Sequence, residues 1–343
     1  MKAVQLAEPR QFRFVDVPEP DSPGPGDSVV RVHCVGICGT DYGGYLGKMP
    51  FFSYPRIPGH ELGVEVVSVG DGVANVKPGD RCCVEPYINC QKCYSCLRGH
   101  TNCCEVHQTL GVHCDGGLQP LYTVPARKLH LATNLSYSQS ALVETLAIGC
   151  HAVDRAAIQA GETVLVIGAG PIGLTVIEFA KLAGAHTIVM DMNEARLEFV
   201  RDSMGIPDTV LFKGDGSELQ QIKALTESRL CDVVVDATGN NRSMSAAMEY
   251  CTFAGRLVFV GISQDEVSFP HAAIMHRREL TLIASRNALS KDFARIISLI
   301  EDGSIDTQPW ITHRAPLDEM LEVFPSWLDP QSRVVKAIIE ISE

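Results

Sequence analysis

Four cysteines that lie close together in the sequence could bind a metal ion. Cys90, Cys93, Cys96 and Cys104 follow the spacing C-x2-C-x2-C-x7-C. Gaps of two residues let one turn of backbone direct neighbouring sulfurs to a common point, and four thiolates suit a closed, structural zinc site. An iron–sulfur cluster is the alternative metal centre, and four small buried side chains are the alternative without metal. The neighbouring Cys103 leaves the identity of the fourth ligand open.

A second motif could bind phosphate groups. Residues 168–173 read GAGPIG, which fits G-x-G-x-x-G directly after the apolar segment VLVI and directly before a helical pattern. Such glycines permit a tight turn and a close approach of the backbone to a pyrophosphate, whose charge then faces the helix N-terminus. The members that we expect to contact a dinucleotide are Gly168, Gly170, Pro171, Ile172 and Gly173. A structural glycine turn is the alternative.

Asp191 strengthens the dinucleotide interpretation. It closes the next expected strand, 18 positions after Gly173, where a carboxylate can bond both ribose hydroxyls. A 2′-phosphate would face a like charge there, so the sequence favours NAD over NADP. Arg196 lies five residues beyond Asp191 and could soften that preference. A helix-capping role for Asp191 is the alternative.

Three further residues could supply an open metal site. Cys38 follows a β-like run, and His60 and Glu61 follow Ile57-Pro58-Gly59. A thiolate, an imidazole and a carboxylate from separate loops are typical ligands of a catalytic zinc that keeps one position for substrate. Taken singly each residue type also occurs in ordinary packing, and their separation in sequence leaves both interpretations open at this point.

The elements that must position these residues change in character along the chain. Residues 1–150 contain short β-branched runs and turn signals such as KPGD, which predict a β-rich domain. From about Gly161, apolar strands alternate with helical patterns, which predicts a parallel sheet covered by helices. The expected segments there are 163–167, 172–183, 187–190, 194–203, 233–236 and 257–260. Beyond about residue 286 follow an amphipathic segment, 293–300, and an apolar strand, 334–341.

Composition limits the possible partners. The chain has 343 residues, and 29 Lys+Arg against 41 Asp+Glu give a net charge of −12, which argues against nucleic acid or an anionic membrane surface as partner. We expect no signal peptide, because the first residues, MKAVQLAEPR, lead straight into polar residues. We also expect no membrane span, because the longest uncharged apolar stretch, Thr163–Ile177, is short and holds three glycines and a proline. The 13 cysteines are an odd number, which favours reduced thiols in the cytoplasm over a disulfide framework.

These motifs together resemble the zinc-dependent medium-chain alcohol and polyol dehydrogenases over nearly the whole chain. The matching segments are GICGTD, PGHE, KPGDR, the cysteine segment ending in TNCC, GAGPIG, DATG and GRLVFVG. The resemblance implies an α/β fold: a GroES-like, β-rich catalytic domain over residues 1–150, with a structural-zinc lobe at about 85–110, and a doubly wound, parallel-sheet Rossmann domain over 151–285. Residues 286–343 would return to the catalytic domain.

The resemblance also implies roles for individual residues. The residues that would hold a structural zinc are Cys90, Cys93, Cys96 and Cys104. Cys38 and His60 would bind a catalytic zinc together with the acidic Glu144, which would act directly or through water, and Glu61 would be a carboxylate that can exchange with water on the metal. Thr40 would take the proton of a substrate hydroxyl while hydride passes to NAD. Thr238 and Gly261, from DATG and GRLVFVG, would join the cofactor site together with Arg286. The remaining cysteines, which include Cys103, would be small core residues.

The substrate is expected to be a small sugar acid or polyol. Segments such as PFFSYPR and GVHCDGG look most like a bacterial branch similar to L-galactonate and L-gulonate 5-dehydrogenases. Arg56, Arg286 and Asn287 would then lie near the substrate, where an arginine fork could bind an aldonate carboxylate. Structural roles or cofactor contacts for the two arginines are the alternative.

Two different functions stay open at the level of the sequence. The same kind of enzyme could act on a threonine-like or simple secondary alcohol, or the chain could be a catalytically idle zinc-binding relative with a structural or regulatory role. Cys38, His60 and the glycine motif are all retained, which favours an active enzyme. The resemblance also implies a homodimer or homotetramer.

Overall fold

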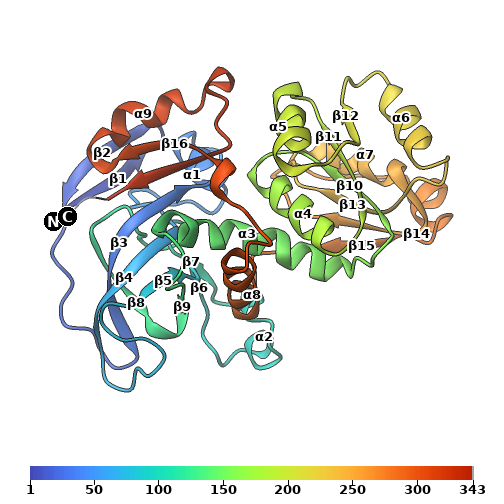
Figure 1. Ribbon diagram of the computed structural model, residues 1–343. Coiled ribbons are helices and arrows are strands. Elements are labelled where there is room, and N and C mark those ends of the chain that lie inside the picture. The colour runs from blue at the N-terminus through green and yellow to red at the C-terminus, as the bar shows by residue number, and fades with distance from the viewer. Residues whose placement is uncertain (342–343) are drawn as a thin grey trace. The chain divides into compact units, whose positions relative to one another are not determined.

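Residues 1–341 are described in a computed structural model, in which the chain divides into two compact units (Figure 1). Unit 1 comprises Met1–Thr145 and Leu289–Glu343, and unit 2 comprises Leu146–Ala288. The C-terminal segment therefore folds with the N-terminal one. Within residues 1–341, no helix combines the length and the apolar character that crossing a bilayer requires.

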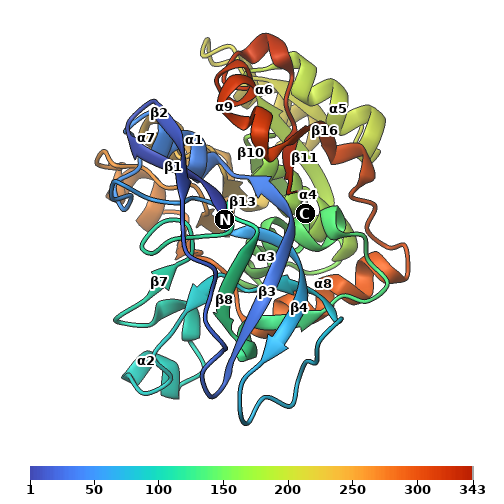
Figure 2. The same ribbon diagram turned by 90° about the vertical axis from the view of Figure 1, so that its left-hand side faces the viewer.

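Unit 1 is built on a seven-stranded sheet whose longest strands, β3 and β4, run side by side (Figure 2). Its strands in order are β16 (Ile311–Pro316), β17 (Lys336–Glu340), β3 (Asp27–Ile37), β4 (Glu61–Val69), β5 (Arg81–Val84) and β9 (Leu129–Leu131), with β8 (Leu121–Pro125) paired to β3. β17 pairs antiparallel with β3, so the last described strand lies beside the end of β3 that leads to Cys38.

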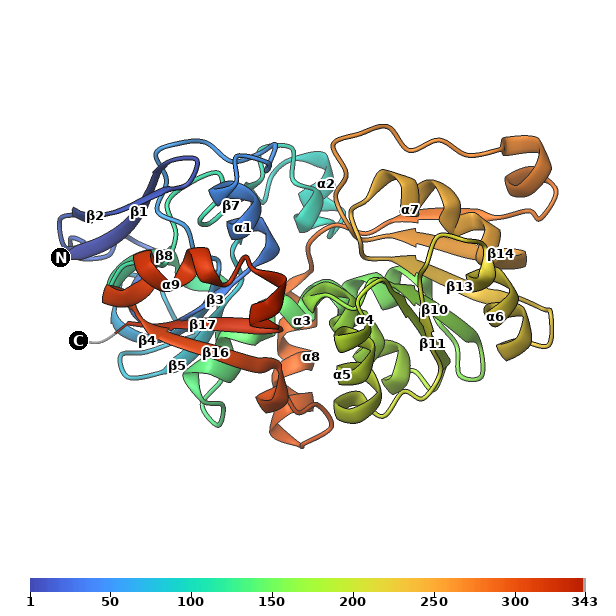
Figure 3. The ribbon, with the colours of Figure 1, turned by 90° about the horizontal axis from the view of Figure 1, so that it is seen from above.

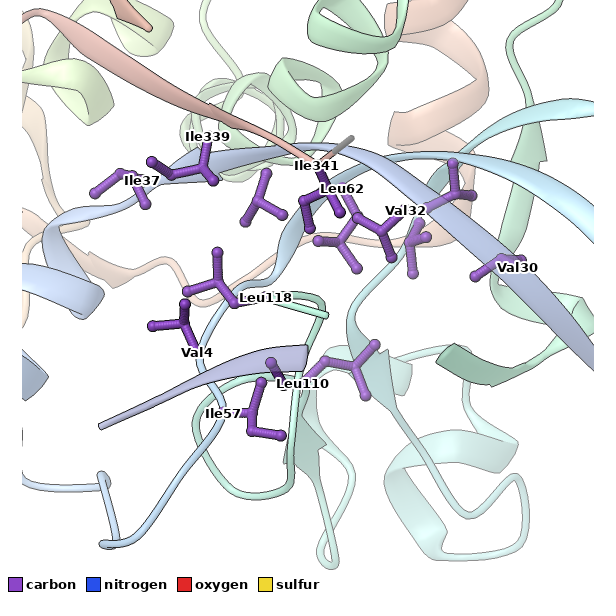
Figure 4. Close-up of a cluster of buried hydrophobic side chains, with 14 of the residues drawn as sticks. Val4, Val30, Val32, Ile37, Ile57, Leu62, Leu110, Leu118, Ile339 and Ile341 are labelled. Atoms are coloured by element: carbon purple, nitrogen blue, oxygen red, sulfur yellow. The ribbon is translucent and has the colours of Figure 1, made fainter. Parts of the chain in front are cut away.

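The core of unit 1 lies between this sheet and the first strand of the chain. Figure 4 shows side chains of β3, β4 and β17 facing Val4 of β1 (Lys2–Glu8) and Leu118. Most of β3 is buried on both faces, as expected for a central strand of a covered sheet, whereas β1 has exposed residues at its two ends. Smaller elements complete the unit: β2 (Gln11–Asp16), β6 (Tyr87–Ile88), β7 (Gln108–Thr109), α1 (Gly39–Tyr45), α2 (Tyr94–Leu97), α8 (Ser290–Glu301) and α9 (Met320–Ser326).

Unit 2 contains a six-stranded, all-parallel sheet with helices on both faces (Figure 3). The strands in order are β12 (Thr209–Leu211), β11 (His186–Asp191), β10 (Thr163–Ile167), β13 (Cys231–Asp236), β14 (Cys251–Phe259) and β15 (Thr281–Ala284). The helices are α4 (Pro171–Leu182), α5 (Glu194–Met204), α6 (Ser217–Leu225) and α7 (Asn241–Ala246). This order reverses direction at β10, which is the doubly wound arrangement. The predicted α/β fold class is confirmed.

Helix α3 (Tyr137–Ala156) begins in unit 1 and ends in unit 2. The sequence patterns did not single out this helix, or the β1–β2 hairpin. The strands and helices expected in unit 2 agree with the structure to within a few residues, except that β14 begins six residues before the expected start at 257. The closing strand is shorter than expected, since β17 covers Lys336–Glu340.

Candidate functional sites

The sulfurs of Cys90, Cys93, Cys96 and Cys104, here called the cysteine quartet, all lie within 4.8 Å of one another. The quartet forms because the chain turns sharply between the two short strands β6 and β7, and α2 begins directly after Cys93. Four sulfurs at this separation can surround one ion and leave no ligand position open. This is the donor set of a structural zinc site.

Hydrogen-bond donors face the sulfurs of the quartet. The backbone N–H of Cys90 donates to Sγ of Cys104 at 3.3 Å, that of Cys93 donates to Sγ of Cys90 at 3.3 Å, and the Asn89 amide lies 3.5 Å from Sγ of Cys96. Backbone N–H groups of Glu105 and Cys96 lower the pKa of the Cys93 thiol to about 6. Such donors stabilise thiolates, the form in which cysteine binds metal.

Cys103 and Cys104 take different positions. Cys104 is buried and belongs to the quartet, whereas Cys103 is exposed and lies outside it. The expectation that Cys103 is a small core residue is therefore wrong, because the 3-10 turn over Thr101–Cys103 directs it outward. Cys114 is only partly buried. None of the 13 cysteines forms a disulfide in the part of the chain that the structure describes.

A second group of donors, the Cys38 cluster, consists of Cys38, His60 and Glu61, whose ligand atoms also lie within 4.8 Å of one another. Cys38 follows β3 and is the N-cap of α1, while Glu61 begins β4. The antiparallel pairing of β3 with β4 places Gly36 opposite Glu61. A Cβ on Gly36 would lie 2.1 Å from Oε2 of Glu61, so this glycine makes room for the carboxylate.

Buried charges surround the Cys38 cluster. Asp41, 2% exposed, accepts from the backbone N–H of Cys38 at 2.8 Å, and its other oxygen lies 3.9 Å from Nδ1 of His60. Burial alone would lower the pKa of His60, but the negative charges of Asp41 and Cys38 outweigh burial and raise it well above its usual value. Lys336 of β17 lies 2.5 Å from Oε1 of Glu61 and donates to the carbonyl of Ile37 at 3.1 Å.

Glu144 of α3 is a further carboxylate near this cluster, but it does not belong to the group whose ligand atoms all lie within 4.8 Å of one another. It is 5% exposed, which rules out a solvated helix charge. Burial raises the pKa of Glu144. The charge of Glu61 raises it further, and the charge of His60 opposes that increase. The phenol of Tyr87 donates a hydrogen bond to Oε1 of Glu144. Three residues of this site were not predicted from the sequence: Asp41, Tyr87 and Lys336. For Lys336 the sequence does hold a signal, because it is a lone lysine in the expected apolar strand 334–341.

The donor set fits a divalent cation. Nδ1 of His60, Oε2 of Glu61 and Oδ1 of Asp41 are buried without a hydrogen-bond partner among the described residues. Buried polar atoms normally find a partner, so a group of unpartnered polar atoms that includes two carboxylate oxygens is typical of a cation site. Thr40 lies two residues after Cys38 in the first turn of α1 and is not its N-cap, which is Cys38.

The glycine motif of unit 2 forms a tight cradle at the carboxyl end of β10. Gly168 has φ +96°, and a Cβ on Gly173 would lie 1.7 Å from the carbonyl oxygen of Gly168. Gly170 is the N-cap of α4, with Pro171 at its first position and Ile172 next. Only glycine fits the first and last positions, and the helix N-terminus beyond them faces any bound anion.

Asp191 ends β11 beside this cradle. Its oxygens accept from the backbone N–H of Ala169 at 2.6 Å and of Asn193 at 2.8 Å. Asn193, not Asp191, caps α5, so the capping alternative is excluded. A Cβ on Gly170 would lie 2.9 Å from Nη1 of Arg196, so this guanidinium reaches the glycine loop.

The other predicted cofactor residues follow neighbouring strands. Thr238 comes after β13, and its hydroxyl donates to Asp236 at 2.7 Å. Gly261 comes after β14, and a Cβ there would lie 2.2 Å from the amide nitrogen of Gly239. Arg286 follows β15 and is exposed. Because the sheet is parallel, all three lie at the edge that carries the glycine motif.

The predicted substrate residues come from both units: Arg56 belongs to unit 1, and Arg286 and Asn287 belong to unit 2. Arg56 lies 3.0 Å from Oδ1 of Asp115 and donates to Ser53 at 2.6 Å, so its guanidinium is already engaged within unit 1. Asn287 stands next to Arg286 with φ +51°, at the carboxyl end of β15 in unit 2. Arg286 itself is exposed to solvent.

Comparison with known proteins identifies the family. A model of the alcohol dehydrogenase GroES-like domain matches residues 24–134, and a zinc-binding dehydrogenase model matches residues 171–302. The chain is 38% identical to L-galactonate-5-dehydrogenase of Escherichia coli (strain K12), over 92% of each chain. It is 33% identical to L-arabinitol 4-dehydrogenase of Hypocrea jecorina, over 92% of this chain and 85% of the relative.

A solved structure agrees with these relatives. An alcohol dehydrogenase from E. coli CFT073, crystallised with NADH, matches with a TM-score of 0.91 and 28% identity over 99% of each chain. The sequence and structure comparisons thus cover both units. The chain therefore belongs to the zinc-type alcohol dehydrogenase family, whose members are zinc-dependent oxidoreductases.

Proposed function

We propose that this chain transfers hydride between NAD and a secondary hydroxyl of a sugar acid or polyol, with an aldonate such as L-galactonate or L-gulonate as substrate. One zinc ion would bind Cys38, His60 and Glu144, and Glu61 would be a further carboxylate that can exchange with water on this ion. A second zinc ion would bind the cysteine quartet. The observation that carries the proposal is the buried group of polar atoms without hydrogen-bond partners on His60, Glu61 and Asp41, beside the thiol of Cys38.

When bound, zinc supplies a Lewis acid that lowers the pKa of the substrate hydroxyl, and NAD supplies the hydride acceptor. The chain's own residues hold and orient these groups. Asp41 faces Nδ1 of His60 and so favours ligation through the other ring nitrogen. Thr40, in the first turn after Cys38, takes the hydroxyl proton.

The cofactor preference rests on unit 2. The glycine cradle admits a pyrophosphate to the N-terminus of α4, and Asp191 at the end of β11 can accept from the ribose hydroxyls. Arg196 reaches toward Gly170, so its charge supports the pyrophosphate more directly than it would support a 2′-phosphate.

The relatives support the substrate class. Those with 30% identity or more include enzymes named for an aldonate, for a deoxy aldonate and for L-arabinitol. Arg286, exposed after the carboxyl end of β15 at the edge of the sheet that carries the glycine motif, would bind the aldonate carboxylate. A polyol is the second candidate substrate, favoured by the arabinitol dehydrogenases among the relatives.

A panel of substrates tests the proposal. The zinc-loaded chain is incubated with NAD and L-galactonate, L-gulonate, galactitol or L-arabinitol, and NADH formation is followed by absorbance. We expect aldonates to give a kcat/KM about 10-fold above that of the matched alditol, and Arg286→Ala to remove that difference. Equal turnover of aldonate and alditol by the wild type would refute carboxylate recognition, and no NADH from any of them would refute the proposed function.

A further inference from the structure

Glu61 and Glu144, two of the carboxylates near Cys38 and His60, are each bound by one buried hydrogen-bond donor. The two donors differ in charge. Glu61 is bound by the ammonium of Lys336 and Glu144 by the phenol of Tyr87. All four side chains are 5% exposed or less. Each contact engages the Oε1 atom of its carboxylate. Oε2 of Glu61 has no hydrogen-bond partner among the described residues.

The ring of Tyr87 is fixed by its neighbours. Tyr87 lies in the short strand β6 and is 2% exposed. Its ring lies edge-on to the fully buried Phe293, with centroids 6.2 Å apart, and lies 6.1 Å from the ring of His107 on another side. A ring packed in this way can direct its hydroxyl along one line only, and that line ends at Glu144.

The difference between the donors affects the charge that a cation would meet. Lys336 neutralises Glu61, whereas a phenol orients Glu144 without cancelling its charge. Cys38 as thiolate and Glu144 then carry negative charges that no buried ammonium neutralises, while the carboxylate of Asp41 faces Nδ1 of His60. For Glu144 to serve as the carboxylate ligand of the cation, its orientation must be fixed. Tyr87 is the described side chain that donates a hydrogen bond to it.

We propose that Tyr87 is a positioning residue for the catalytic cation, which holds one oxygen of Glu144 so that the other is directed to the ion bound by Cys38 and His60. This inference rests on the proposed function, since it assumes that these residues bind zinc. Tyr87 acts on the cation through Glu144, and its removal weakens ion binding without altering the fold.

The test compares zinc affinity in two phenylalanine variants. Zinc is titrated out of the holoenzyme with a chromophoric chelator, and the weaker of its two sites is followed. We expect Tyr87→Phe to weaken this site about 10-fold, the scale on which loss of a partner behind a metal ligand acts. Tyr42→Phe is the matched control, because it removes a buried phenol hydroxyl that has no hydrogen-bond partner among the described residues. The tighter site, at the cysteine quartet, should be unchanged in both variants.

A double-mutant cycle separates positioning from a general structural effect. If Tyr87 acts only through Glu144, then Tyr87→Phe changes zinc affinity in the wild type but not in a Glu144→Ala background. An equal loss in both backgrounds, or no loss in either, would overturn the inference.

The result is independent of substrate identity. Zinc affinity is measured without NAD or alcohol, so an unchanged affinity in Tyr87→Phe refutes the positioning role even if the wild type oxidises aldonates. Conversely, a wild type that binds two zinc ions but forms no NADH would refute the proposed function while the cycle still reports on Tyr87.

Discussion

The four sulfurs of the cysteine quartet come from residues 90–104, whereas the Cys38 cluster and its partners draw on β3, β4, α3 and β17. The quartet has one kind of donor and is oriented by nearby backbone N–H groups. The Cys38 cluster mixes a thiol, an imidazole and a carboxylate, and residues outside the cluster orient them: Asp41 contacts Cys38 and faces His60, and Lys336 binds Glu61. A site that only stabilises the fold can be built locally, while a site that must leave a ligand position open needs its ligands fixed by the surrounding fold.

Removal of a quartet ligand should give the largest change in free energy, as a loss of stability of the folded state. Cys104→Ser removes one of four thiolates, so we expect the folded state to lose about 5 kcal/mol or more of stabilisation by metal. Thermal unfolding and zinc content should show a lower Tm and one zinc ion lost per chain.

Cys103→Ser is the matched control for that change. Cys103 is adjacent but exposed and outside the quartet, so Tm and zinc content should stay at wild-type values. If the two variants behave alike, the assignment of Cys104 as the fourth ligand is wrong.

Removal of a ligand from the Cys38 cluster should affect activity more than stability. His60→Ala should lower kcat/KM about 10³-fold, equivalent to about 4 kcal/mol of transition-state stabilisation. Zinc content should fall from two ions to one, and the Tm should fall by less than in Cys104→Ser. A fall in Tm as large as that of Cys104→Ser would contradict the distinction between the two sites.

A buried ion pair of unit 1 lies outside both groups of ligands. Glu85, directly after β5, is bound by Lys128, and Ser290 donates to it at 2.5 Å. Burial alone would raise the pKa of Glu85, but the hydrogen bond from His130 and the charge of Lys128 outweigh burial and lower it. Lys128→Met leaves this carboxylate without its ammonium partner and should cost about 3 kcal/mol of the free energy of unfolding at neutral pH.

The pH dependence of that cost follows from the sign of the shift. Since the pKa of Glu85 is lower in the folded state than its ordinary 4.5, its stabilising effect is present above pH 4.5 and disappears as pH falls through the folded value. Denaturant unfolding of wild type and Lys128→Met should therefore converge in acid. A difference between them that stays constant as the pH falls below 4.5 would contradict the role of the charge.

The smallest effect is expected in unit 2, which contains neither group of metal ligands. Asp191→Ala removes the acceptor proposed for the ribose hydroxyls and should lower kcat/KM for NAD about 10-fold, or about 1.4 kcal/mol, with a smaller change for NADP. Initial rates with the two cofactors measure it. Zinc content should remain at two ions, and a loss of either ion would mean that the change acts on more than cofactor binding.

The sequence predicted the quartet and the glycine cradle because each is a local pattern. The spacing of Cys90, Cys93 and Cys96 already determines how the sulfurs converge, and residues 168–173 carry their own turn geometry. The alternating segments of unit 2 were predicted for the same reason, since hydrophobic period and turn residues act over short distances.

The partners of the Cys38 cluster could not be predicted in this way. Lys336 is 275 residues from Glu61, and Tyr87 is 57 residues from Glu144. Their contacts depend on which strands pair, and β17 reaches β3 only after unit 2 has been completed. The family resemblance implied Glu144 as a ligand, but nothing in the residue pattern indicated what orients it.

Metal analysis of three proteins tests the central claim most directly. Wild type, Cys104→Ser and His60→Ala are purified with zinc, and zinc per chain is measured beside NADH formation from L-galactonate. We predict two ions with activity in the wild type, one ion in each variant, and the loss of about 10³-fold in kcat/KM only in His60→Ala when both variants are assayed below their unfolding temperatures. A wild type with a single zinc ion, or a His60→Ala variant that keeps two ions and its activity, would contradict the presence of a second, catalytic site at Cys38 and His60.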